Sequence, residues 1–227
     1  MEKIVPEGNL IHEDRFESLD NWHLEGLAAG AGIVAPGVLR LDCSGSRQGG
    51  AGCMAFCKED FPDNLCVEYD LFVEEKNGLV ITFLAMRGLG GEDAITGVPA
   101  RTGVFDDYVG ENATTRSYHC SVSRYDDKGE HTGVSNWRRN PGLHLMGQGE
   151  DLCRQIRTRY HVALIKAGRT CQLQVDGAVA SGFTDPGELP DEIPTSGKVG
   201  FRVIGAKAIA RFSNFKVTAL RRGSGQR

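Results

Sequence analysis

Between Tyr118 and Gln148 the sequence gathers side chains that can move protons and hold anions. His119 and His144 carry imidazoles, which titrate near neutral pH and serve as general acids and bases. Arg138 carries a planar guanidinium, which can clamp a carboxylate through two hydrogen bonds. Tyr118 adds a phenol. These four side chains are predicted to form a catalytic group that acts on a ligand made of hydroxyls and carboxylates.

Further side chains are predicted to contact the same ligand by hydrogen bonding, ion pairing or stacking: Tyr108, Asn136, Gln148, Ser121, Lys166, Arg202 and Asp107. Two of them end apolar strands and two fall in a long loop. Arg138 and Arg139 alternate in direction along a strand, so at most one faces the site, and Arg138 is assigned to it. A structural role for the histidines, an ion pair of Arg138 and ordinary packing of the tyrosines remain open as alternatives.

The strand that must position His119 is predicted from Tyr118 to Tyr125, in the sequence YHCSVSRY. A strand that only fills a core shows an apolar row on at least one face. Alternation gives this strand two rows that both carry functional groups: Tyr118, Cys120, Val122 and Arg124 on one face, and His119, Ser121, Ser123 and Tyr125 on the other. The second row consists of hydrogen-bonding groups, which favours a binding surface on that face.

Short strand-like segments follow one another along the chain, including VLRLDC, LVITFLAM, YHVALIK and KVGFRVI. Turn signals such as Asn77-Gly78 separate them, and no stretch has the period of an amphipathic helix of three or more turns. The pattern predicts an all-β fold, a two-sheet antiparallel β-sandwich of the jelly-roll type, as a single domain over residues 1–227. Its first and last strands are expected side by side. Residues 87–116 are predicted to form a long binding loop, and residues 221–227 a frayed tail.

Composition limits the possible partners. The chain has 227 residues, of which 40% are hydrophobic, and this suffices for a core. Its net charge of −4 argues against nucleic acid and against an anionic membrane as partners. No secretory signal or membrane span is evident, which predicts a cytoplasmic location, although a mature secreted fragment would look the same. The seven cysteines are scattered, so no disulfide and no zinc site is expected. No cofactor is expected either. Asp106 and Asp107 could bind calcium, but without a series of further acids a solvated loop is favoured, so no metal is assigned.

Several segments resemble the YesU-like family of bacterial proteins: YHCSVSRY, NWRRNPGLHLMGQGEDL, YHVALIKAGRTCQLQVDG and GKVGFRVIGAKAIARFSNFKV. The distinctive positions of this resemblance are His119, Ser121, Asn136, Arg138, Gly142, His144, Gln148, Gly149, Asp151 and the run Gly197 to Arg202. The resemblance implies a concanavalin A-like lectin/glucanase fold. It also implies a carbohydrate-related role in the breakdown of plant or algal polysaccharide, without a settled reaction.

Glucanases of this fold carry three acids on one strand, in the pattern Glu-x-Asp-x(-x)-Glu. Here Glu68 and Asp70 start such a pattern, but Phe72 or Val73 stands where the last acid belongs, and Glu74 lies too far along. A double-displacement hydrolase needs two carboxyls ~5–5.5 Å apart. The strand is therefore not expected to supply a hydrolytic pair.

β-Elimination on a uronic-acid-containing oligosaccharide suits the Tyr118–Gln148 stretch better. Elimination needs a base, an acid and positive charge on the substrate carboxylate, and histidine, tyrosine and arginine side chains supply all three. The sequence thus predicts a lyase acting on an acidic oligosaccharide or polysaccharide. A glycoside hydrolase of the same fold and a non-catalytic, lectin-like carbohydrate-binding module remain the alternatives.

Overall fold

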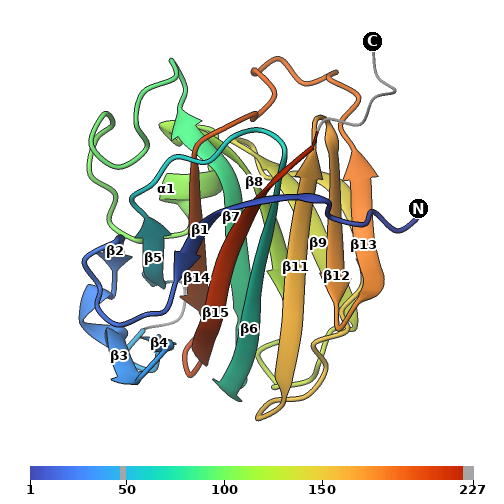
Figure 1. Cartoon of the computed structure of the whole chain (residues 1–227). Helices are drawn as coiled ribbons and strands as arrows, with labels where there is room; N and C mark the ends of the chain where they lie inside the picture. Colours follow the sequence, from blue (N-terminus) through green and yellow to red (C-terminus); the bar gives the residue numbers. More distant parts are fainter. Residues whose placement is uncertain (47–49, 222–227) are drawn as a thin grey trace.

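The structure is a computed structural model that describes residues 1–46 and 50–221, so all but the first residue of the predicted tail at 221–227 lies outside it. Within these residues the chain forms a series of strands (Figure 1): β1 Gly8–Asp14, β2 Trp22–Gly26, β3 Ala31–Ala35, β4 Val38–Asp42, β5 Cys53–Cys57, β6 Leu65–Glu75, β7 Leu79–Gly88, β8 Thr115–Val122, β9 Val134–Asn140, β10 His144–Glu150, β11 Arg159–Ala167, β12 Thr170–Val175, β13 Ala178–Thr184, β14 Lys198–Ile204 and β15 Ile209–Leu220. Two single turns of helix accompany them, η1 Ala28–Gly30 and α1 Asp106–Val109. In the described part of the chain no helix is long and apolar enough to cross a membrane.

The strands form two antiparallel sheets packed as a sandwich. The eight-stranded sheet has the order β13-β12-β11-β6-β15-β4-β3, with β1 paired to β15, and the seven-stranded sheet has the order β10-β9-β8-β7-β14-β5-β2. Figure 1 looks onto the eight-stranded sheet, with the seven-stranded sheet behind it. The predicted all-β, two-sheet antiparallel sandwich is confirmed. The first and last strands lie side by side, as expected.

The main core lies between the two sheets. Apolar and polar side chains alternate along β14 and β15, so that the apolar ones point inward from both strands. Phe201 of β14 stacks on Phe212 of β15 with ring centroids 4.2 Å apart, and Tyr69 of β6 meets Phe201 edge-on. Full burial of a side chain of this kind contributes ~1.5–3 kcal/mol. The same alternation turns Arg202 away from the core, to the outer face of the seven-stranded sheet.

A second apolar cluster covers part of that outer face. Met54 and Phe56 of β5 and Ile81 and Phe83 of β7 point outward there. They are covered by the loop of residues 89–114, through its buried side chains Ala94, Tyr108 and Val109. The loop is shorter than the predicted 87–116, because Arg87 and Gly88 still pair with Arg116 and Thr115 as part of β7 and β8. The apolar cluster does not cover the β8–β10 side of this face.

Candidate functional site

Strands β8, β9 and β10 are neighbours in the seven-stranded sheet, and their register brings five of the predicted site residues together. His119 lies opposite Arg138, Ser121 lies opposite Asn136, and Asn136 lies opposite Gln148. Residues directly opposite each other on neighbouring strands share a face of the sheet. The Asn136 and Gln148 amides are hydrogen-bonded at 2.8 Å. We call these five residues the polar face; they lie on the outer side of the seven-stranded sheet.

His119 is held neutral on the polar face. Only 2% of its surface is exposed, and its Nδ1 lies 2.9 Å from the side-chain nitrogen of Asn140. The ring of Phe105, from the loop 89–114, lies against it with ring centroids 6.2 Å apart. Burial, aided by the positive charges of Arg138 and Arg202, lowers the pKa of His119 to about 3. The imidazole is therefore uncharged at neutral pH.

This low pKa makes His119 a source of acid lability. The folded pKa lies below the unfolded value of ~6.5, so the unfolded chain takes up the proton first as the pH falls. The stability gained by keeping His119 neutral is complete above about pH 6.5 and is lost progressively toward about pH 3. We expect the melting temperature of a His119→Ala variant to fall less than that of the wild type between about pH 7 and about pH 4. Equal falls in the two proteins would contradict the assignment.

Two arginines reach this face without a carboxylate partner, and a third, Arg202, is buried under the loop on the same side of the sheet. Arg138 donates from Nη1 to the carbonyl oxygen of Leu143 at 2.6 Å. Arg124, which follows β8, donates to the carbonyl oxygen of Val134 at 3.2 Å and lies 2.9 Å from the Asn136 amide. None of these arginines, Arg202 included, belongs to an ion pair among the described side chains. Their uncompensated positive charge makes the surface suited to an anionic ligand.

A hollow of about 440 Å³ opens beside the polar face. Leu79 and Ile81 of β7 line it, together with Phe105 and with Tyr125 and Asp127 from the segment after β8. Ile81 lies opposite Ser121, so the hollow and the polar face are continuous. Its volume falls within the ~300–1,000 Å³ that small-molecule sites usually have.

The structure corrects the predicted positions of Tyr118 and His144. Both lie opposite Arg139, the inward-facing neighbour of Arg138. Tyr118 is fully buried and donates its hydroxyl to Asp185 at 2.5 Å. For His144 the cause is an irregularity in β10, whose pairing with β9 shifts by one residue between Leu145 and Gly147. This shift leaves His144 out of step with Gln148 and the polar face, so neither Tyr118 nor His144 is placed to act in catalysis there.

The predicted ligand contacts of Tyr108 and Asp107 are also not supported. Tyr108 is completely buried, donates to Glu25 Oε2 at 2.5 Å and stacks on Phe56. Asp107 accepts hydrogen bonds at 2.6 Å from the backbone nitrogen and the hydroxyl of Thr102. Both residues hold the loop in place. The aromatic side chain that the loop presents to the site is Phe105.

The sequence of this chain identifies its family. Residues 9–217 match the family described as a domain of unknown function, DUF1961. The chain belongs to this family. It is similar to the uncharacterized protein YesU of Bacillus subtilis (strain 168), with 29% identity over 152 residues, 65% of this chain and 68% of that protein. The YesU-like resemblance seen in the sequence is thereby confirmed.

Solved structures show which fold the family member has. A protein of unknown function with a galectin-like fold from Bacillus subtilis has a TM-score of 0.80 and 26% identity, covering 95% of this chain and 99% of that chain. The β-glucanase of Bacillus licheniformis has a TM-score of 0.61 and 12% identity, covering 94% of this chain and 99% of that chain. This member of the DUF1961 family therefore has the predicted concanavalin A-like jelly roll.

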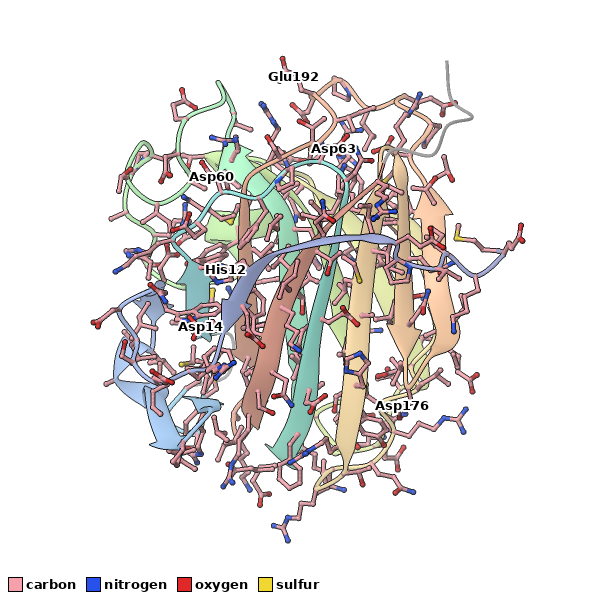
Figure 2. The ribbon with its side chains drawn as sticks, in the orientation of Figure 1. His12, Asp14, Asp60, Asp63, Asp176 and Glu192 are labelled. Carbon is pink, nitrogen blue, oxygen red and sulfur yellow. The ribbon has the colours of Figure 1, made fainter. Side chains whose placement is uncertain are left out.

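The acids that resemble the glucanase pattern lie on the opposite side of this domain. Glu68 and Asp70 are on β6 of the eight-stranded sheet, and their outward-facing carboxylates each lie 3.2 Å from a nitrogen of His161. Lys166 is also remote from the polar face. It belongs to β11 of the same sheet, is fully buried and pairs with Asp63, which lies at the upper edge of the sandwich in Figure 2. The prediction that Lys166 binds the ligand is wrong for this reason.

Two residues beside His119 were missed at the level of sequence. Asn140 ends β9 and contacts the His119 ring, while its Oδ1 is buried without a hydrogen bond. Phe105 stood in the aromatic run of the loop, where the sequence favoured Tyr108 instead. Among the described residues, no group of three or more histidine, cysteine or acidic side chains is placed to hold a metal ion. The site thus consists of a neutral imidazole, amides, arginines and one aromatic ring.

Proposed function

We propose that the protein binds a uronate-containing carbohydrate on its polar face and cleaves it by β-elimination. The observation that carries the proposal is the pairing of His119, kept neutral by burial, with Arg138, an arginine without a carboxylate partner directly across the strand. The jelly-roll fold shared with a β-glucanase supports a carbohydrate as the ligand. Oligosaccharides from plant or algal polysaccharides are the substrate class that we propose.

In this mechanism Arg138 and Arg124 bind the substrate carboxylate. Their positive charge stabilises the negative charge that develops on it when the neighbouring C5 loses its proton. His119 takes this proton, the electron pair left at C5 forms a C4=C5 double bond, and the C4–O bond breaks. The imidazolium then returns the proton to the departing oxygen, so the imidazole is neutral again at the end of the cycle.

Asn140 decides which nitrogen of His119 can act as the base. For Nε2 to accept a proton, Nδ1 must carry the ring hydrogen and donate it. In the structure the amide nitrogen of Asn140 faces Nδ1 at 2.9 Å and its Oδ1 has no hydrogen-bond partner; turning the amide by 180° would bring Oδ1 to Nδ1 as the acceptor. Asn140 is therefore a positioning residue in this proposal, with Ser117 contacting the same amide at 2.9 Å.

Among the described residues, the carboxylates that the sequence offered for hydrolysis are not placed as a pair on this face. Glu68 and Asp70 lie on the outer side of the other sheet, and Asp107 is bound to Thr102. Binding without cleavage is the second candidate. The 2% exposure of His119 favours it, because a lectin-like module uses the arginines and amides without needing the imidazole.

Replacing Arg138 by alanine tests the proposed contact. We expect the variant to bind uronate oligosaccharides more weakly and to turn them over more slowly, since the clamp acts in both the ground state and the transition state. A hydrogen bond to a charged group contributes ~1.5–3 kcal/mol, which corresponds to a loss of ~10–150-fold. The measurement is the near-ultraviolet absorbance of the unsaturated product over a panel of plant and algal uronate oligosaccharides.

Arg159→Ala provides the matched control, because Arg159 is an exposed arginine on the other sheet, and this variant should behave as the wild type. A new reducing end without unsaturation would rule out elimination. Binding that depends on Arg138 without any product would select the second candidate.

A further inference from the structure

Arg202 is a buried guanidinium that lacks partners for most of its donors. It lies on β14, and its surface is fully covered by the loop 89–114 and the sheet. Its Nη1 contacts the sulfur of Met54 at 3.4 Å. Its Nε and Nη2 are buried without any hydrogen-bond partner. Such a group is costly to bury, so its presence calls for an explanation.

The other deeply buried arginines of the described chain are paired. Arg139 lies 3.0 Å from Asp185, and Arg101 lies 2.5 Å from Glu25. Arg202 instead faces two aromatic rings, with its Cζ 5.0 Å from the Phe105 centroid and 5.2 Å from that of Tyr108. These cation–π contacts offset part of the cost of burial, but they satisfy none of the in-plane N–H groups. Burial lowers the pKa of Arg202 to about 10, so the side chain is still positively charged at neutral pH.

Phe105 separates Arg202 from the hollow. Its ring lies over Arg202 on one side and against His119 on the other, with centroids 6.2 Å apart in the second contact. Phe105 also lines the hollow, together with Ile81, the direct neighbour of Arg202 across β7 and β14. The side chain of Phe105 is only partly buried, and the adjoining Val104 is exposed. A rotation of this ring would uncover the guanidinium on the side of the hollow, while Tyr108 would still cover it from the loop.

We propose that Arg202 is a second anion-binding subsite, which an oxyanion group of the ligand reaches when Phe105 moves aside. The inference rests on the proposed function for the ligand being a carbohydrate, and it adds that this carbohydrate carries at least two acidic groups. Arg138 on β9 and Arg202 on β14 are separated by β8 and β7. Three strand spacings amount to roughly 14 Å, which is more than one sugar ring spans. The ligand is thus a polyanionic chain, with carboxylate or sulfate groups on different sugars.

The first test is the stability of Arg202→Met, which keeps the length of the side chain and removes its charge. A buried charge without hydrogen-bond partners destabilises the folded state. Its removal in Arg202→Met should therefore raise the melting temperature above that of the wild type by about 2 °C or more. Arg139→Met is the matched control and should lower the melting temperature, because it leaves Asp185 buried without its partner. A lower melting temperature for Arg202→Met would mean that Arg202 serves the fold, and would overturn the proposal.

The second test measures anion binding directly. Wild type, Phe105→Ala and Phe105→Ala/Arg202→Met are melted in inorganic sulfate and in acetate at constant ionic strength. The melting temperature of Phe105→Ala should rise more steeply with anion concentration than that of the wild type. In the double variant this additional slope should be absent. The anion with the larger Arg202-dependent response distinguishes a sulfate group from a carboxylate. The same slope in the two variants would overturn the proposal.

These tests fail separately from those of the proposed function. Neither uses a sugar or measures turnover, so the absence of an unsaturated product would leave their outcome intact. Conversely, the protein could prove to be a lyase that depends on Arg138 while its melting temperature responds to anions independently of Arg202. That result would support the proposed function and rule out the second subsite.

Discussion

Replacing His119 by alanine should lower turnover of a uronate-containing substrate by ~10²–10⁴-fold, the usual contribution of a positioned acid–base group. Substrate affinity should change little, because the carboxylate is held by Arg138 and Arg124 and not by the imidazole. The measurement is kcat and KM from the absorbance of the unsaturated product. An unchanged kcat would show that His119 takes no part in the reaction. A rise in KM alone would show that it contributes only to substrate binding.

The pH profile provides an independent check of the same assignment. Because burial lowers the pKa of His119 to about 3, the imidazole stays neutral and turnover should not decline between about pH 8 and about pH 5 on its account. Asn140→Asp places a carboxylate beside Nδ1, where the amide now lies at 2.9 Å. This variant should raise the pKa of His119 and shift the acid limb of the profile toward neutral pH. A wild-type acid limb near pH 6.5, the ordinary histidine value, would contradict the buried, neutral state.

Asp185→Ala should lower the free energy of unfolding by ~3–5 kcal/mol, the largest loss of stability that we expect from a single substitution. The carboxylate of Asp185 is fully buried and lies 3.0 Å from the equally buried Arg139. It also accepts the Tyr118 hydroxyl at 2.5 Å and the backbone N–H of Gly187 at 2.7 Å. The variant would leave the charge of Arg139 buried without a counter-ion. Urea denaturation, compared with wild type at equal m-value, measures the effect.

Glu192→Ala is the matched control. Glu192 forms an ion pair with Arg116 at 3.0 Å, but its side chain is 77% exposed and stands at the upper rim of the molecule in Figure 2. A surface pair of this kind contributes ~0–1 kcal/mol, so the control should unfold nearly as the wild type does. Adding Arg139→Met to Asp185→Ala should recover part of the lost stability, since it removes the unpaired charge. Equal losses in Asp185→Ala and Glu192→Ala would show that burial of the pair does not determine its contribution.

The sequence by itself determined the features that depend on local periodicity. Alternation in β8 predicted that His119 and Ser121 face away from Tyr118 and Cys120, and the structure places the first pair on the polar face and the second pair in the core. The same period of two predicted that Arg138 and Arg139 face opposite sides of the sheet, as they do. The succession of short strands predicted the two-sheet sandwich, and the motifs predicted the family.

The tertiary structure decided what depends on register between strands and on packing between distant segments. His144 does not share a face with Gln148 because the pairing of β10 with β9 shifts by one residue between Leu145 and Gly147, and no property of His144 itself reveals such a shift. Tyr108 is buried because Glu25, 83 positions away, accepts its hydroxyl. Arg202 lies within the apolar strand β14, but that it is buried without a partner follows only from the loop folded over it. Burial and pairing are properties of the packed molecule. Periodicity could therefore name the candidate site residues, but only the tertiary contacts could show which of them lie together.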